Sequence, residues 1–149
     1  MTPKQQLDSF LAKYDPEIAA LGRRILGKMR RRLPGAVEIV YDNYNALVIG
    51  FGPTERPSEA VFSIALYPRW INLFFLDGAV LPDPHGRLKG SGNQVRSVRL
   101  ETAALLDDPQ IVALMKDAVQ LADVPFDSGQ KRKMVIRMIS KKQRPRKPI

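Results

Sequence analysis

The chain has 149 residues, of which 44% are hydrophobic and 26% are charged, and it contains no cysteine. This length and this balance are typical of one globular domain with a core of its own. The lack of cysteine excludes disulfides, thiolate nucleophiles, iron–sulfur clusters and zinc sites with cysteine ligands.

The formal net charge of +9 is unevenly distributed along the chain. Residues 1–35 carry 8 basic and 3 acidic side chains, residues 36–130 carry 7 basic and 12 acidic ones, and residues 131–149 carry 9 basic ones and no acid. The cationic character therefore belongs to the two ends. We expect a cytoplasmic protein without membrane insertion, because the first residues lack a signal-peptide core and no apolar run approaches the roughly 20 residues of a membrane helix.

Two helices are predicted at the start of the chain. Thr2 is followed by Pro3 and then by Gln5, which is the pattern of a capping box. Asp15 and Pro16 predict the start of a second helix. Apolar residues recur at helical spacing through both segments, namely Leu7, Phe10, Leu11, Tyr14, Ile18, Leu21, Ile25 and Met29. Arginines occupy the opposite face of the second helix, which is therefore amphipathic with a basic exterior.

The middle of the chain predicts strands. Short segments rich in β-branched and aromatic residues are separated by tight turns, at 37–41, 46–51, 60–66 and 70–76. Connections this short join neighbouring strands as hairpins and exclude parallel crossovers, so we expect an antiparallel meander. A fifth strand is expected at 94–100, after a long loop rich in glycine and proline, and loops of that length are often functional.

The last third of the chain predicts one more helix and a basic end. Asp108 and Pro109 start a helix whose apolar residues lie at Ile111, Leu114, Met115 and Ala118. Residues 134–140 predict a last edge strand. Residues 141–149 are too polar and too rich in proline to pack, so they predict a flexible basic tail.

The predicted fold class is α+β. We expect a five- or six-stranded antiparallel sheet, two N-terminal helices and a C-terminal helix. The predicted organisation is a single domain over residues 1–140, followed by the basic tail 141–149.

Three segments resemble a known family. They are YDNYNALVIGFGPTERPSEAVFSIALYPRWINLFFLDG, LKGSGNQVRSVRLE and VIRMISKKQRPR, and together they are similar to the YdhG-like domain, a bacterial family of small α+β proteins of unknown function. The resemblance covers most of the chain from about Val37 onward. It implies a fold rather than a chemistry, although some relatives are described as frataxin-like iron chaperones. Relatives often carry lysine where this chain has Asn93.

The glycine-rich segment before the fifth strand has two interpretations. Lys89, Gly90, Ser91 and Gly92 could present backbone N–H groups and one positive charge to an anion. They could equally form a bend in which glycine adopts positive φ at a strand entry, since a strand follows rather than a helix. Arg96 is expected on the inward face of that strand, paired either with an acid such as Glu38 or Asp42 or with an anionic ligand.

A second candidate site lies at two strand turns. The first turn carries Tyr41, Asp42 and Tyr44, and the second carries Arg69 and Trp70. In a simple meander both turns lie at the same end of the sheet. These residues therefore predict either a polar pocket with aromatic walls or ordinary half-buried side chains at strand ends.

The basic ends form a third candidate, a surface that contacts a polyanion. Its residues are Arg23, Arg24, Arg30 and Arg31 of the second helix and Lys141, Lys142, Arg144, Arg146 and Lys147 of the tail. Such charge suits nucleic acid or an acidic protein partner. The tail lacks interleaved aromatic residues and any recognisable nucleic-acid-binding motif, so the alternative is a tail that only aids solubility.

No catalytic residue is predicted. His85 is the only histidine, it lies in a turn, and no GxSxG segment accompanies it. No metal-ligand spacing is present, and no cofactor is predicted. Iron enters only through the alternative that the resemblance implies.

These observations favour a non-catalytic binding or interaction module that contacts a polyanion such as nucleic acid, or an anionic small ligand. The first alternative is a frataxin-like iron chaperone. The second is a small-molecule-binding protein or enzyme with its pocket at the strand turns. The sequence leaves the oligomeric state open.

Overall fold

A computed structural model describes residues 1–149 as three α-helices and six strands. The helices are α1 (Pro3–Leu11), α2 (Pro16–Arg32) and α3 (Pro109–Leu121). The strands are β1 (Val37–Asp42), β2 (Leu47–Gly52), β3 (Phe62–Leu66), β4 (Ile71–Phe75), β5 (Arg96–Arg99) and β6 (Lys133–Ile139). The predicted α+β class is confirmed, with two helices before the strands and one after most of them.

The six strands form one sheet in the order β5-β4-β3-β2-β1-β6. Strands β1 to β5 are an antiparallel meander, as the short connections between β1 and β4 predict, and β5 joins it after the long loop 76–95. The expectation of a purely antiparallel sheet is wrong at β6, which is an edge strand as predicted but pairs with β1 in parallel.

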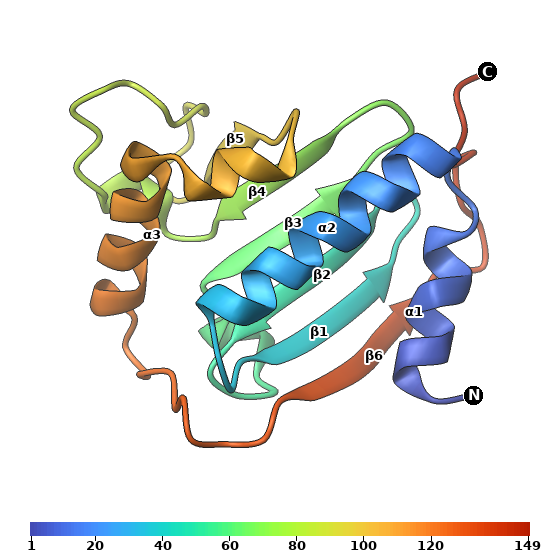
Figure 1. The fold of residues 1–149 in the computed structure, drawn as a ribbon, viewed down its shortest axis with the longest axis horizontal. Coiled ribbons are helices and arrows are strands. Elements are labelled where there is room, and N and C mark those ends of the chain that lie inside the picture. The colour runs from blue at the N-terminus through green and yellow to red at the C-terminus, as the bar shows by residue number, and fades with distance from the viewer.

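The parallel pairing follows from the route of the chain after α3. The segment 122–132 returns to the end of the sheet where β1 begins (Figure 1). There the Gln130 side chain donates hydrogen bonds to the carbonyls of Gly35, at 2.7 Å, and Pro53, at 3.0 Å. Lys133 then enters opposite Val37, so β6 runs in the direction of β1. Helix α3 joins β5 to β6, and a connection through a helix lets the next strand enter the sheet in the direction of the one before it, which β1, β3 and β5 share.

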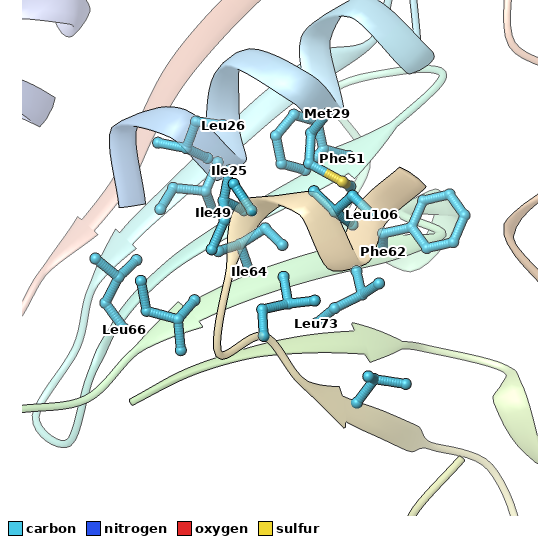
Figure 2. Close-up of a cluster of buried hydrophobic side chains, with 14 of the residues drawn as sticks. Ile25, Leu26, Met29, Ile49, Phe51, Phe62, Ile64, Leu66, Leu73 and Leu106 are labelled. Carbon is cyan, nitrogen blue, oxygen red and sulfur yellow. The ribbon is translucent and has the colours of Figure 1, made fainter. Parts of the chain in front are cut away.

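One face of the sheet carries the core. Helix α2 lies across this face (Figure 1), and Figure 2 shows its Ile25, Leu26 and Met29 above Ile49 and Ile64 of the sheet. All five of these side chains are at most 1% exposed. Buried residues of α1, α3 and the 3-10 helix Ala103–Asp107 belong to the same cluster. The amphipathic pattern of the helices is therefore confirmed.

Local signals in the sequence set where the first two helices begin. The Thr2 hydroxyl accepts a hydrogen bond from the Gln5 N–H, and the Gln5 side chain accepts one from the Thr2 N–H, which completes the predicted capping box. Asp15 stands at the N-cap of α2 without a side-chain hydrogen bond. The last turn of α2 carries Arg30, Arg31 and Arg32, where the helix dipole favours cations.

Tyr14, between α1 and α2, ties the helices to the end of the sheet. Its hydroxyl donates to the Leu66 carbonyl at 2.7 Å and accepts from the Leu47 N–H at 3.0 Å. The side chain is buried, and burial raises the pKa of its hydroxyl above the ordinary value. This link holds the start of α2 over the ends of β2 and β3, where the candidate site lies.

Candidate functional site

The C-terminal segment packs against the end of the sheet, around Arg146. The Arg146 side chain is 3% exposed, and its guanidinium donates to the Asp42 carboxylate at 2.9 Å and to the carbonyls of Asn43 and Tyr44. The Arg144 N–H also donates to the Tyr44 carbonyl, at 2.8 Å. The expectation that residues 141–149 do not pack is therefore wrong. The expectation rested on the polarity of the segment. That polarity does not prevent packing, because the buried Asp42 carboxylate forms an ion pair with Arg146.

Asp42 is the centre of this attachment. Its side chain is fully buried, and it accepts hydrogen bonds from Arg146 and, at 2.8 Å, from the Lys13 ammonium. Burial by itself raises the pKa of Asp42, but hydrogen bonds from Lys13, Gln143 and Arg146 outweigh it, so the pKa lies below its ordinary value. The carboxylate is ionised at neutral pH and holds the C-terminal segment in place.

The attached segment forms one wall of a groove, which we call groove 1. The opposite wall is the turn between β3 and β4, and the volume is about 720 Å³. Ten residues line it: Asn45, Tyr67, Pro68, Arg69, Trp70, Arg144, Pro145, Lys147, Pro148 and Ile149. Three of them are cationic and none has an acidic side chain. Groove 1 therefore combines positive charge with aromatic and proline surface.

A second groove of about 740 Å³, groove 2, continues from the same turn toward α2. Its cationic residues are Arg24, Lys28, Arg69 and Arg99, and its acidic residues are Glu17 and Glu101. Arg69 and Trp70 line both grooves. Figure 1 shows why they meet: the C-terminal segment, the start of α2 and the β3–β4 turn lie at the same end of the molecule. We call the residues of the two grooves, together with Tyr44, the Trp70 surface.

Aromatic and cationic side chains alternate at the centre of this surface. Trp70 is 37% exposed, its ring lies 5.6 Å from the ring of Tyr67, and the guanidinium carbon of Arg99 lies 4.6 Å from its centroid. Tyr44, beside groove 1, is 48% exposed and lies 5.6 Å from the guanidinium carbon of Arg144. These distances are within the range of cation–π contacts. Aromatic and cationic side chains do not alternate along the tail sequence, but the fold brings the two kinds together on this surface.

The predicted polyanion residues separate into three groups. Arg24, Arg144 and Lys147 line the grooves. Arg30 and Arg146 line neither groove, and each is held by a buried acid: Arg30 makes a two-point ion pair with Glu38 at 2.8 and 2.9 Å, and Arg146 pairs with Asp42. The remaining four, Arg23, Arg31, Lys141 and Lys142, lie outside both grooves.

The residues predicted for the strand-turn pocket are only partly brought together. Arg69 and Trp70 line both grooves, and Tyr44 stands at the edge of groove 1. Asp42 is instead a buried anchor, and Tyr41 is half-buried within β1, in register with Val48 and outside both grooves. Sequence reasoning missed Lys28 and Arg99. Arg99 reaches Trp70 because the Leu100 N–H bonds to the Ile71 carbonyl at 2.8 Å, which sets the end of β5 beside the start of β4.

The glycine-rich loop folds on itself. The Arg96 guanidinium donates to the carbonyls of Gly92, at 2.7 Å, and Val95, at 2.8 Å, and the backbone of Lys89 pairs with Ser97. Gly90 has φ +131°, as the bend interpretation requires. The predicted ion pair of Arg96 with Glu38 or Asp42 is wrong, because both acids already have other partners. Ser91 and Gly92 are exposed, and the anion-binding interpretation of this loop stays a prediction.

The acidic side chains do not form a metal donor set. No group of three or more histidine, aspartate or glutamate residues comes together. Three of the acids each pair with two cations or with one at two points: Glu38 with Arg30, Asp42 with Lys13 and Arg146, and Asp107 with Lys28 and Arg32. The iron-chaperone alternative stays a prediction from the resemblance.

None of the helices combines the length and the apolar composition needed to traverse a bilayer, and the longest, α2, has 17 residues with six basic side chains.

Comparison with known proteins found no matching family model, no matching curated protein and no matching solved structure. Membership of the YdhG-like family stays a prediction from the sequence segments quoted above.

Proposed function

We propose that this protein is a non-catalytic module that binds nucleic acid through the Trp70 surface. The observation that carries the proposal is the set of cations along the two grooves. Arg24, Arg69, Arg99, Arg144 and Lys147 form no ion pair and gather along the two grooves, and of the groove cations only Lys28 is paired, with Asp107. Cations that are free and gathered along one surface are available to neutralise phosphates and release counterions.

Two further features support nucleic acid over other polyanions. Arg99 lies over Trp70, which packs beside Tyr67, and Arg144 lies beside Tyr44. Aromatic side chains beside cations are the usual means of holding bases as well as phosphates. Arginine outnumbers lysine in both grooves, and its planar guanidinium suits phosphate oxygens and stacking alike. The proposal includes the cytoplasmic location that the sequence leads us to expect.

The proposal is tested by the salt dependence of binding. A fluorescently labelled oligonucleotide is titrated with protein between about 50 and 200 mM salt, with anisotropy as the readout, for the natural chain and for the double variant Arg144→Glu/Lys147→Glu. Each phosphate contact contributes about −0.7 to the slope of log K against log salt on a single strand. We expect the variant to bind at least about tenfold more weakly and its slope to be flatter by about 1.4.

The matched control is Lys131→Glu/Arg137→Glu, which changes the net charge equally at exposed residues outside both grooves that form no ion pair. We expect it to bind nearly as tightly as the natural chain. Equal losses in the two double variants would mean that only net charge matters, and no binding by the natural chain at low salt would remove the proposal. Truncation at residue 140 is not a suitable test, because it also removes Arg146 and exposes the buried Asp42.

A second candidate function rests on groove 1 alone. Its volume of about 720 Å³ falls in the range of small-molecule sites, and its walls are aromatic and proline surface with three cations. This combination suits an anionic small molecule with a planar ring. A mononucleotide that raises the melting temperature and competes with the oligonucleotide would support this candidate.

A further inference from the structure

The two grooves adjoin at Trp70, and together they make a track along the surface. Groove 1 and groove 2 share Arg69 and Trp70, so a ligand long enough to extend beyond one groove meets the other at these two residues. Free cations stand on both sides of this junction: Arg144 and Lys147 on the side of the C-terminal segment, and Arg24 and Arg99 on the side of α2 and β5. A chain with regularly spaced phosphates fits such a track better than a compact anion that fills one groove.

The junction itself is a cluster of planar groups. The guanidinium carbon of Arg99 lies 4.6 Å from the centroid of the Trp70 ring, and the centroid of the Tyr67 ring lies 5.6 Å from it. Trp70 is 37% exposed to solvent. Tyr67 and Trp70 are fixed by the tight turn in which the Tyr67 N–H donates to the Trp70 carbonyl at 2.9 Å. Planar groups that are already ordered lose little entropy when another planar group packs against them.

A double helix cannot use this cluster. In a duplex the bases are paired and stacked inside, and proteins reach them through a helix or ribbon that enters a groove. The Trp70 surface is hollowed at two places, and its central side chains come from the β3–β4 turn and the end of β5. Unpaired bases, in contrast, expose the faces that pack on aromatic rings and guanidinium groups.

We infer that the nucleic acid bound by this protein is single-stranded and crosses Trp70 to occupy both grooves, with its bases packed on the cluster of Arg99, Trp70 and Tyr67. This inference rests on the proposed function and adds the strandedness, the path and the side chains that contact bases. It assigns Trp70 to base stacking, and Arg24, Arg69, Arg144 and Lys147 to the phosphates.

The first experiment uses the intrinsic fluorescence of Trp70, which is the only tryptophan of the chain. Thymidine monophosphate, a short oligothymidylate and a longer one are each titrated at low salt, next to a duplex of equal length and to inorganic polyphosphate, a base-free chain. We expect saturable quenching by the oligothymidylates, with affinity that rises with length, and binding at least about tenfold weaker for the duplex and for polyphosphate.

The outcomes separate the inference from the proposed function. Equal affinity for duplex and single strand, or for polyphosphate and oligothymidylate, overturns the inference and leaves nucleic-acid or polyanion binding standing. A mononucleotide that binds as tightly as the longest strand also overturns it, in favour of a small ligand in one groove. If no nucleic acid binds in either form, the proposed function itself fails.

The second experiment substitutes the stacking residue, with anisotropy of a labelled single strand as the readout. Trp70→Ala is expected to lower the affinity about tenfold or more, because stacking on an aromatic side chain contributes strongly for each base. Trp70→Phe keeps a ring and is expected to restore most of the affinity, which a purely structural or electrostatic role of Trp70 would not explain. Circular dichroism checks that both variants are folded. Equal affinities of the alanine and phenylalanine variants would overturn the inference.

Discussion

Replacing Arg146 with methionine is expected to lower the free energy of unfolding by about 3 to 5 kcal/mol. Arg146 and Asp42 form an ion pair at 2.9 Å in which both side chains are almost completely buried. Methionine fills much of the same space but leaves the Asp42 carboxylate with Lys13 as its only cationic partner. The carbonyls of Asn43 and Tyr44 lose donors as well. Removing the fully buried partner of a buried charge is among the most destabilising changes that one substitution can make.

The measurement is urea unfolding of the natural chain, Arg146→Met, Asp42→Asn and the double variant. Lys147→Met is the control, because this neighbour is exposed and forms no ion pair, and we expect it to change stability by less than about 0.5 kcal/mol. The double variant is expected to be more stable than the sum of the single losses predicts, because neither partner is left charged and alone. A loss of stability below about 1 kcal/mol in Arg146→Met would contradict a stabilising role for the Arg146–Asp42 pair. So would a loss in the double variant equal to the sum of the two single losses.

The Arg146–Asp42 pair also predicts how the difference in stability between the natural chain and Arg146→Met depends on pH. The pKa of Asp42 is lowered in the folded protein, so its ionised form stabilises the fold above the ordinary pKa of about 3.9, and that stability is lost as the pH falls through the folded pKa. In Arg146→Met one of the hydrogen bonds that lower this pKa is lost. The gap in stability between the two proteins should therefore be largest near neutral pH and narrow below about pH 4.

Replacing Gly35 with alanine is expected to cost about 3 kcal/mol or more, because two separate penalties add. Gly35 has φ +79°, where a Cβ is strained. A Cβ at this position would also lie 2.1 Å from the Asp127 carbonyl oxygen, so the backbone of the segment that leads into β6 would have to move. The Gly35 carbonyl is itself held by the Gln130 side chain at 2.7 Å, which limits how far that segment can yield.

Gly86→Ala separates the two penalties. Gly86 has φ +62°, but the methyl group of an alanine there would meet nothing within 4 Å, so only the backbone strain of about 1 kcal/mol applies. Both variants are compared with the natural chain by urea unfolding. Equal losses of stability in the two variants would show that a clash between the methyl group of residue 35 and Asp127 costs nothing. The backbone leading into β6 would then not be constrained at this point.

Most of the secondary structure could be predicted from local signals. The capping box at Thr2, the apolar spacing through Met29 and the short turns between strands each depend on residues close in sequence. The parallel pairing of β6 could not be predicted this way, because it depends on contacts between segments about a hundred residues apart, such as Gln130 with Gly35. No local pattern distinguishes a parallel from an antiparallel edge strand.

The candidate site was predictable in its parts but not in its assembly. Arg69 and Trp70 stood out as a charged and an aromatic residue in one tight turn, and the charge of the tail was evident. The partner of Arg146 could not be read from its own segment, since Asp42 lies about a hundred residues earlier. Arg99 reaches Trp70 only through the pairing of β5 with β4. Polarity alone therefore predicted an unpacked tail where the structure has a buried arginine.

The most direct test of nucleic-acid binding at the Trp70 surface is an NMR titration of the isotope-labelled protein with a single-stranded oligonucleotide. The indole N–H of Trp70 gives one side-chain signal of its own type, because the chain has a single tryptophan. We predict that this signal and the backbone signals of Arg24, Arg69, Arg99 and Arg144 shift together and saturate. Shifts confined to the loop around Gly90, or the absence of any saturable shift at low salt, would contradict the proposed function.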